Sequence, residues 1–429
     1  MEIVSAAARD YHTRPDMKFH PFIALRAAPE FAGAIAAPPY DVVDRAEARQ
    51  WAEGNPRCFL RVSRPDLEFP DATPPDDPAV YRRAAERFAQ FRAEGWLIRD
   101  TGPAFYLYRI ADAAWEQRGV VGVCDVSDYE SGAIRRHEKT RAAPEADRIR
   151  HTEAINANAG PVLLAWPGDP RFAALCAEAE RGEPLYDIRR PDGVRHTIWH
   201  FSRSEPLAEL FGRASAFYIA DGHHRAASAA AVARRRRAVH PAHTGAEEYN
   251  RFLAVVFPAD QLRIGPYNRK VRDLNGWSPH AFLAAVRSQF DVHPARGPVP
   301  SGPGRIALWV EGIWWELSWT LTDAERGDPV SALDVSVLQN RLLSPVLGVR
   351  DPRTDPRLVF RGGAGSAEAL AADAARGEGA AVFSLFPVNI AELMAVADAG
   401  LTMPPKSTWF EPKLLSGLLT HTLDDASGQ

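Results

Sequence analysis

The sequence contains few cysteines and no long apolar segment. Only three cysteines occur among its 429 residues (Cys58, Cys124 and Cys176), and no two of them have CxxC spacing. This excludes a disulfide framework and a cysteine-based zinc site. No apolar run reaches the length of about eighteen residues that a transmembrane helix needs. We therefore expect a protein of the reducing cytoplasm without a membrane partner.

The sequence also lacks a strong net charge and a secretory signal. Its formal net charge is −4, so we expect no nucleic-acid partner despite the basic run ARRRR at 233–237. Cations at the end of a helix complement its dipole, and we interpret this run as a solvent-facing helix end. The N-terminal stretch has no apolar segment typical of a signal peptide. Residues 1–16 are predicted to form a flexible arm, with structure beginning near Met17.

Apolar and charged residues make up 46% and 25% of the chain, as in ordinary globular proteins. Short apolar runs alternate with helical patterns, without a strict alternation of strand and helix. We expect an α+β (mixed α/β) fold with many antiparallel connections. The first region is predicted at 17–240 and a second α+β region, closing the site, at 250–429, joined by a linker at 239–250.

Two local patterns are especially clear. In PAVYRRAAERFAQFRAEG, apolar residues recur at spacings of three and four, and Asp77-Pro78 is a typical helix start. RIALWVEG and IWWELSWTL predict an antiparallel hairpin that turns at Glu311-Gly312.

The stretch AFYIADGHHRAAS raises the main functional question. It predicts a buried strand, a turn at Asp221-Gly222, and a helix that begins near His223. Helix N-termini bind anions through their backbone N–H groups, and the planar fork of Arg225 suits phosphate oxygens. Asp221, Gly222 and Arg225 are therefore candidate phosphate-binding residues, and His223 and His224 are candidate proton-transfer groups. The alternative is a structural corner that Asp221 caps, with the two histidines at the surface.

A metal site at these histidines is the weaker interpretation. Adjacent histidines project in different directions, and no pattern such as HExxH completes a ligand set. No residue is assigned as a metal ligand.

The Gly-x-x-Arg turn after a strand resembles the phosphate-binding signature of the ParB/sulfiredoxin superfamily. The sequence DGHHR is similar to the corresponding motif of archaeal ADP-dependent serine kinases of that superfamily. Five motifs in order also resemble the family called domain of unknown function number 1015, often labelled ParB-like. They are APPYDVV, NPRCFLRVSRPD, HEKTRAAPEADRIRH, YIADGHHRAAS and MPPKSTWFEPKLLSGL.

The segment HEKTRAAPEADRIRH concentrates charge before and within a predicted helix start at 145–147. Phosphoryl transfer needs a carboxylate to accept a proton and cations to hold phosphates. Glu138 is the preferred base, Arg141 and Arg148 are phosphate or substrate clamps, and His137 is a substrate contact. The alternative is a solvated helix start stabilised by ion pairs.

Two further motifs supply candidates. The prolines of MPPKSTWFEP restrict the backbone and could hold Lys406, Ser407 and Thr408 toward a phosphate, although no P-loop precedes them. The alternative is a terminal strap that only packs. In APPYDVV, Asp41 follows a rigid turn and could bind a substrate ammonium, or simply belong to that turn.

Together these resemblances imply a nucleotide-dependent phosphotransferase acting on a small hydroxylated metabolite, with serine or phosphoserine as the best guess. ADP or ATP and Mg²⁺ are the implied cofactors, and the reverse or phosphatase direction would need the same parts. The alternative is a nucleotide-binding switch that resembles CTP-binding ParB proteins and transfers no group. The sequence leaves a homodimer open.

Overall fold

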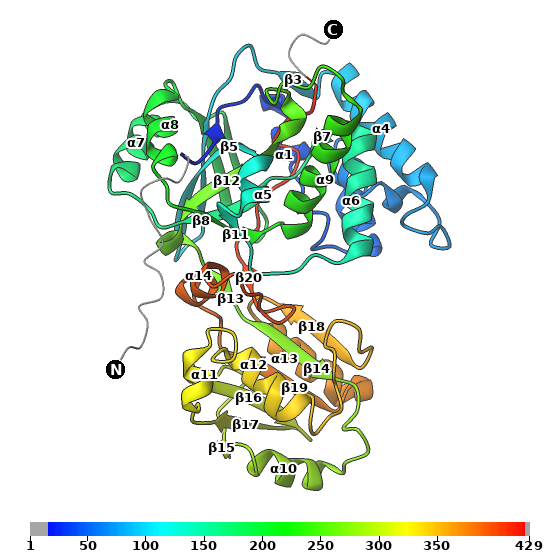
Figure 1. Cartoon of the computed structure of the whole chain (residues 1–429). Helices are drawn as coiled ribbons and strands as arrows, with labels where there is room; N and C mark the ends of the chain where they lie inside the picture. The colour runs from blue at the N-terminus through cyan, green and yellow to red at the C-terminus, as the bar shows by residue number, and fades with distance from the viewer. Residues whose placement is uncertain (1–15, 425–429) are drawn as a thin grey trace, which may run out of the picture. The chain divides into compact units, whose positions relative to one another are not determined.

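The computed structural model describes residues 16–424, which divide into two compact units (Figure 1). Unit 1 contains residues 16–134, 141–258 and 414–424, and unit 2 contains residues 135–140 and 259–413. The arm predicted at 1–16 lies almost wholly outside the described residues. The stretch 239–250, predicted as the linker, belongs to unit 1. None of the helices in the described range is long and apolar enough to cross a membrane.

A nine-stranded mixed sheet forms the centre of unit 1. Along it the strands follow the order β6-β11-β8-β12-β5-β4-β10-β9, and β1 pairs with β5. β12 is parallel to β8 and antiparallel to β5, which makes the sheet mixed. The strands are β1 (Phe19–His20), β4 (Tyr106–Ala111), β5 (Glu116–Asp125), β6 (Ile134–Arg135), β8 (Val162–Trp166), β9 (Tyr186–Arg189), β10 (Arg195–His200), β11 (Phe217–Asp221) and β12 (Arg251–Pro258).

Helix α9 (His223–Val239) packs on this sheet through small side chains. Its alanines, including Ala226, Ala229, Ala230 and Ala233, belong to the core that also contains residues of β8 and β12. Because alanine is small, the helix axis can approach the sheet closely. Helix α6 (Ala142–Ile155) lies beside α9 in Figure 1. The other helices of this region are α5 (Val126–Ser131), α7 (Arg171–Ala179) and α8 (Glu205–Gly212).

The N-terminal part of unit 1 is mainly helical. Helix α4 (Pro78–Ala93) begins as predicted, because the Asp77 side chain accepts a hydrogen bond from the backbone N–H of Ala79, 2.8 Å away. The shorter helices are α1 (Ala32–Ile35), α2 (Arg45–Ala52) and α3 (Leu60–Ser63), with 3₁₀ turns η1 (Pro29–Phe31) and η2 (Pro65–Glu68). A four-stranded sheet joins strands from distant parts of the sequence, in the order β3 (Leu97–Arg99), β2 (Leu25–Ala27), β21 (Leu419–Thr422) and β7 (Ala157–Asn158).

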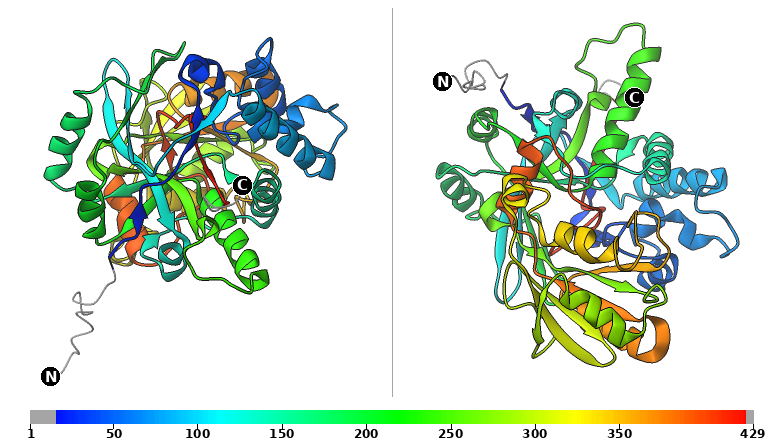
Figure 2. Two further views of the ribbon diagram at one scale, coloured as in Figure 1. Left: turned by 90° about the horizontal axis from the view of Figure 1, so that it is seen from above. Right: turned by 60° about the horizontal axis from the view of Figure 1, so that its bottom comes forward.

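Unit 2 is built on an antiparallel sheet in the order β15-β17-β16-β19-β14-β18, seen from two further sides in Figure 2. The predicted hairpin is present: Glu311 and Gly312 both have positive φ and join β16 to β17. The strands are β14 (Tyr267–Val271), β15 (Asp291–Pro294), β16 (Arg305–Val310), β17 (Ile313–Ser318), β18 (Leu358–Gly362) and β19 (Ala381–Leu385), with the pair β13 (Ile264–Gly265) and β20 (Trp409–Phe410). The helices are α10 (Pro279–Arg287), α11 (Asp323–Gly327), α12 (Asp334–Leu338), α13 (Ser366–Asp373) and α14 (Ile390–Asp398). The α+β fold class predicted from the sequence is confirmed.

Candidate functional site

The turn between β11 and α9 has the predicted geometry. Gly222 occupies the N-cap position with φ 99°, in the left-handed region. A Cβ atom built there would lie 3.0 Å from Cζ and Nε of Arg225. Glycine is therefore required for two reasons, its backbone angle and the closeness of the guanidinium.

Arg225 is mostly buried, with 11% of its side chain exposed. Nη1 donates to the carbonyl of Pro161, and Nη2 lies 3.3 Å from Oδ2 of Asp221. Nε has no hydrogen-bond partner among the residues described. Burial lowers the pKa of Arg225, but the carboxylates of Asp221 and Asp41 outweigh this and the net shift is upward. Most of the guanidinium fork is thus held by the protein itself, and Asp41 is close enough to influence it.

The segment HEKTRAAPEADRIRH contacts the same turn through a hydrogen bond. The backbone N–H of Arg141 donates to Nε2 of His224, 3.1 Å away. Arg141 is the N-cap residue of α6 and is exposed, and His223 is buried. Helix α6 begins at Ala142, three residues before the predicted start at Glu145, and Pro144 lies in its first turn, where proline is tolerated.

Arg148 occupies the centre of the site. Its Nε and Nη2 lie 2.8 and 2.6 Å from Oδ2 of Asp147, and Nη1 lies 3.3 Å from the carbonyl of Ser63. The guanidinium carbon stacks 3.9 Å from the ring centroid of Tyr40, a cation–π contact. Asp147 also accepts a hydrogen bond of 2.8 Å from the hydroxyl of Tyr81. The guanidinium is therefore held by Tyr40 on one face and by hydrogen bonds along its edges.

Two adjoining cavities of unit 1 meet at this arginine. One, of about 180 Å³, also contains Asp41, and the other, of about 40 Å³, contains Arg225. Four residues line both: Tyr40, Ser63, Arg148 and His151. The larger cavity is completed by Arg64, Pro65, Asp66, Pro75, Val80, Tyr81 and Asp147, and the smaller by Thr152, Asn158, Ala159, Gly160, Val162, Ser228, Phe252, Leu253 and Ser416.

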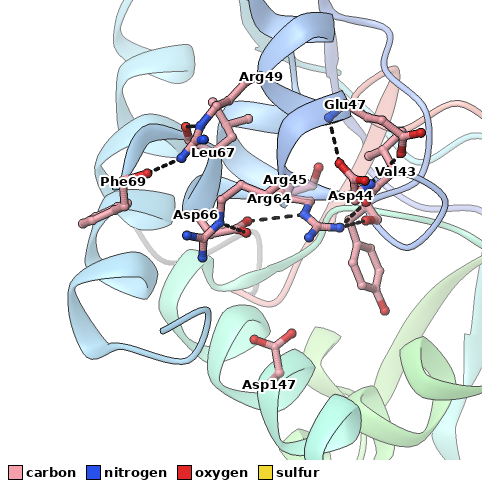
Figure 3. Close-up of polar contacts among 12 residues, drawn as sticks. Val43, Asp44, Arg45, Glu47, Arg49, Arg64, Asp66, Leu67, Phe69 and Asp147 are labelled. Atoms are coloured by element: carbon pink, nitrogen blue, oxygen red, sulfur yellow. Dashed lines mark hydrogen bonds and ion pairs between the residues drawn. The ribbon is translucent and has the colours of Figure 1, made fainter. Parts of the chain in front are cut away.

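A buried ion-pair group supports the wall of the larger cavity. Figure 3 shows Asp66 between two arginines: Arg45 Nε lies 3.1 Å from Oδ2, and Arg64 Nε lies 3.4 Å from Oδ1. Arg64 also donates through Nη1 to the carbonyls of Tyr40 and Val43. These contacts fix the turn that carries Tyr40 and Asp41.

Burial also tunes the histidine at the junction of the cavities. His151 is 4% exposed and its Nε2 lies 2.8 Å from the carbonyl of Val62. Burial, together with the charge of Arg148, lowers the pKa of His151 to about 4. His151 is therefore neutral at physiological pH and donates from Nε2, since a carbonyl only accepts.

The other predicted residues belong to unit 2. Nε2 of His137 lies 3.4 Å from Oγ1 of Thr408, and its carbonyl accepts from the backbone N–H of Met403 at 2.8 Å. Ser407 is buried and its hydroxyl donates to the carbonyl of Pro404 at 2.6 Å. Lys406 Nζ lies 5.5 Å from the ring centroid of Tyr267. Two predicted motifs, His137 and Lys-Ser-Thr, therefore come together here.

The predicted residues thus form two groups. Unit 1 holds Asp41, Arg141, Arg148, Asp221, Gly222, His223, His224 and Arg225; unit 2 holds His137, Glu138, Lys406, Ser407 and Thr408. Glu138 is half-buried, and its role as a base stays a prediction. Four further residues that line the larger cavity, for which the sequence alone indicates no role, are Tyr40, Ser63, Arg64 and Asp66. The signal for them was their position inside APPYDVV and NPRCFLRVSRPD.

Among solved structures, the chain is similar to a conserved hypothetical protein from Pyrococcus furiosus, with 15% identity, 69% of this chain and 94% of that chain covered, and a TM-score of 0.34. A free serine kinase in complex with AMP is 16% identical, with 69% of this chain and 91% of that chain covered and a TM-score of 0.35. SbnI with a C-terminal truncation from Staphylococcus aureus is 12% identical, with 72% of this chain and 90% of that chain covered and a TM-score of 0.37. Similarity this distant does not indicate an activity.

No curated protein matches the sequence. A family model does match, over residues 19–336, and these residues contain four of the five motifs that suggested the relationship. The similarity to the ParB/sulfiredoxin superfamily stays a prediction. The chain belongs to the family described as "Protein of unknown function (DUF1015)".

Proposed function

We propose that the protein is a nucleotide-dependent phosphotransferase acting on a small hydroxylated metabolite, and that the two cavities of unit 1 hold the anionic groups of its ligands. The observation that carries this proposal is the convergence of Arg148, Arg225 and Asp41 on adjoining cavities. These residues come from three separate segments of the chain.

The two guanidinium groups favour phosphate. Each has a strong anchor and a longer contact that an incoming anion could replace: Arg148 Nη1 to the Ser63 carbonyl and Arg225 Nη2 to Asp221, both at 3.3 Å. Charge-assisted hydrogen bonds from arginine to phosphate oxygens are short and strong, so the exchange is favourable. Low solvent exposure strengthens the attraction further.

Asp41 favours an amino acid as the second ligand. Its side chain is exposed and lines the larger cavity, and no described residue gives it a hydrogen bond or an ion pair. A carboxylate placed like this suits an ammonium group, while the arginines suit a phosphate and a carboxylate. Serine and phosphoserine present this combination of groups.

The chemical step follows from these assignments. The substrate hydroxyl oxygen would bond to the terminal phosphorus, the bond from phosphorus to the nucleotide oxygen would break, and a carboxylate base would accept the hydroxyl proton, the role that the sequence predicts for Glu138. His223 and His224, at the start of α9, would assist the transfer. The phosphate contacts expected from the sequence for Lys406, Ser407 and Thr408 stay a prediction, because these residues belong to unit 2. Run in reverse, the same parts would dephosphorylate phosphoserine.

Mg²⁺ would neutralise charge on the phosphates. Of the acidic residues that line the two cavities, Asp66 and Asp147 are paired with arginines, which leaves Asp41 as the carboxylate open to a new ligand. We infer that Mg²⁺ would enter with the nucleotide, because it commonly keeps phosphates and waters as most of its ligands.

Phosphorus NMR tests the activity. The protein is incubated with ADP or ATP, Mg²⁺ and a panel of hydroxy amino acids. A new phosphomonoester signal that appears with one amino acid supports the transferase. Nucleotide that binds but stays unaltered across the panel favours the alternative, a nucleotide-binding switch.

A further inference from the structure

A second polar cluster of unit 1 lies in the loop that follows α9. The loop extends beyond the end of the helix, in green in the right-hand view of Figure 2, and it leads through the 3₁₀ turn η3 (Glu248–Asn250) into β12. His240 is the C-cap residue of α9, and His243 and Glu247 follow within the loop. One ligand atom from each of these three residues can be chosen so that all lie within 4.8 Å of one another.

The two imidazole rings converge through the same nitrogen. Nδ1 of His240 and Nδ1 of His243 lie 2.9 and 3.0 Å from the hydroxyl of Tyr249. Nδ1 of His243 is also 2.9 Å from Oε2 of Glu247, and Nδ1 of His240 is 4.0 Å from Oε1. The Tyr249 hydroxyl has a single hydrogen, so it can donate to only one of the two rings.

The Glu247 carboxylate is held in place by the protein. Its side chain is 6% exposed and accepts hydrogen bonds from the N–H and hydroxyl of Thr244, at 2.6 and 2.8 Å, and from the N–H of Gly245, at 2.9 Å. The side-chain amide of Asn250 donates to it at 3.0 Å, and Asn250 accepts in turn from Nε of Arg237 on α9 at 2.7 Å. Outer contacts of this kind orient the ligands of metal sites.

We propose that His240, His243 and Glu247 bind Zn²⁺. Two imidazole nitrogens and a carboxylate oxygen are common zinc ligands, whereas Mg²⁺ and Ca²⁺ prefer sites made of oxygen alone. Tetrahedral zinc with bonds of about 2.0–2.1 Å needs its ligand atoms about 3.4 Å apart, which small rotations of the two exposed rings supply. The fourth position falls to water or to the Tyr249 hydroxyl.

Such a site would be structural. His240 ends α9, His243 follows in the loop, and Glu247 immediately precedes the turn that enters β12. A bound ion would therefore fasten the far end of α9, whose first turn carries Arg225, to the sheet. Metal that binds only the folded state stabilises it.

The test is zinc titration of the untagged full-length protein by calorimetry, compared with His240→Ala, His243→Ala and Glu247→Gln. His280→Ala is the matched control, because His280 is an exposed histidine at the start of α10. Circular dichroism verifies that each variant is folded. We expect one Zn²⁺ per chain, about tenfold or greater loss of affinity in each cluster variant, and no change in the control.

A second readout does not depend on the variants' stability. Co²⁺ substituted into the wild-type protein should give the visible absorption of a tetrahedral site, and Zn²⁺ should remove it. Zinc affinity that is the same in the three cluster variants as in the control, or no stoichiometric binding by the wild type, would overturn the proposal.

Discussion

The backbone N–H of Arg141 and Nε2 of His224 form a hydrogen bond of 3.1 Å across 83 residues of sequence. This bond joins the charged segment before α6 to the turn that begins α9. Arg148 lies two turns further along α6 and lines the same smaller cavity as Arg225. Two motifs that the sequence singled out separately therefore contribute to one site in unit 1.

Gly222→Ala should destabilise the protein by about 1–3 kcal/mol, because alanine is strained at φ 99° and its methyl group would meet Arg225. Gly132→Ala is the control, since Gly132 also has positive φ but an added Cβ would meet no atom within 4 Å. Denaturant unfolding of both variants isolates the contribution of the guanidinium contact. Equal losses of unfolding free energy in the two variants would contradict a contribution from the Arg225 contact.

Acid should destabilise the protein partly through His151. Its pKa is about 4 in the folded state and near 6.5 when unfolded, so the unfolded chain binds the extra proton. The stabilising contribution is complete above pH 6.5 and is lost as the pH falls toward 4, amounting to roughly 3 kcal/mol. His151→Gln should flatten the dependence of unfolding free energy on pH between 6.5 and 4, and His200→Gln, at an exposed histidine, is the control. A His151→Gln profile as steep as that of the wild type would contradict this assignment.

Asp334 gives the opposite dependence in unit 2. Burial raises the pKa of its carboxyl to about 7, although the backbone N–H of Gly304 donates to it at 3.1 Å. A carboxyl with a raised pKa stabilises the fold below its unfolded value and loses that effect as the pH rises through 7. Asp334→Asn should therefore raise the melting temperature more at pH 8 than at pH 5. The exposed Asp260→Asn serves as the control, and an equal effect at both pH values would argue against a raised pKa.

The sequence predicts those parts of the fold that depend on neighbouring residues. Asp77-Pro78 starts α4, Glu311-Gly312 turns the hairpin, and Gly222 separates β11 from α9. At each of these places, the residue type itself favours the backbone conformation that the structure has there.

The partners of the site residues depend on the tertiary fold and could not be predicted. The sequence predicts an Arg225 fork that is open to phosphate, but the carbonyl of Pro161, 64 residues away, and Asp221 occupy much of it. The sequence predicts a clamp at Arg148, yet nothing in it indicates the contacts with Tyr40 and Ser63. Contacts like these arise only when the helices and turns pack together.

The central claim is that the cavities around Arg148 bind an anionic ligand. The most direct measurement is calorimetric titration with ADP and with phosphoserine of the wild type, Arg148→Ala, Arg148→Lys and Arg150→Ala. Arg150 lies on the same helix, and its side chain is 53% exposed. We expect loss of about tenfold or more in affinity for both Arg148 variants, since lysine cannot reproduce the fork, and unchanged affinity for Arg150→Ala. Equal affinities in all four folded proteins would contradict the claim.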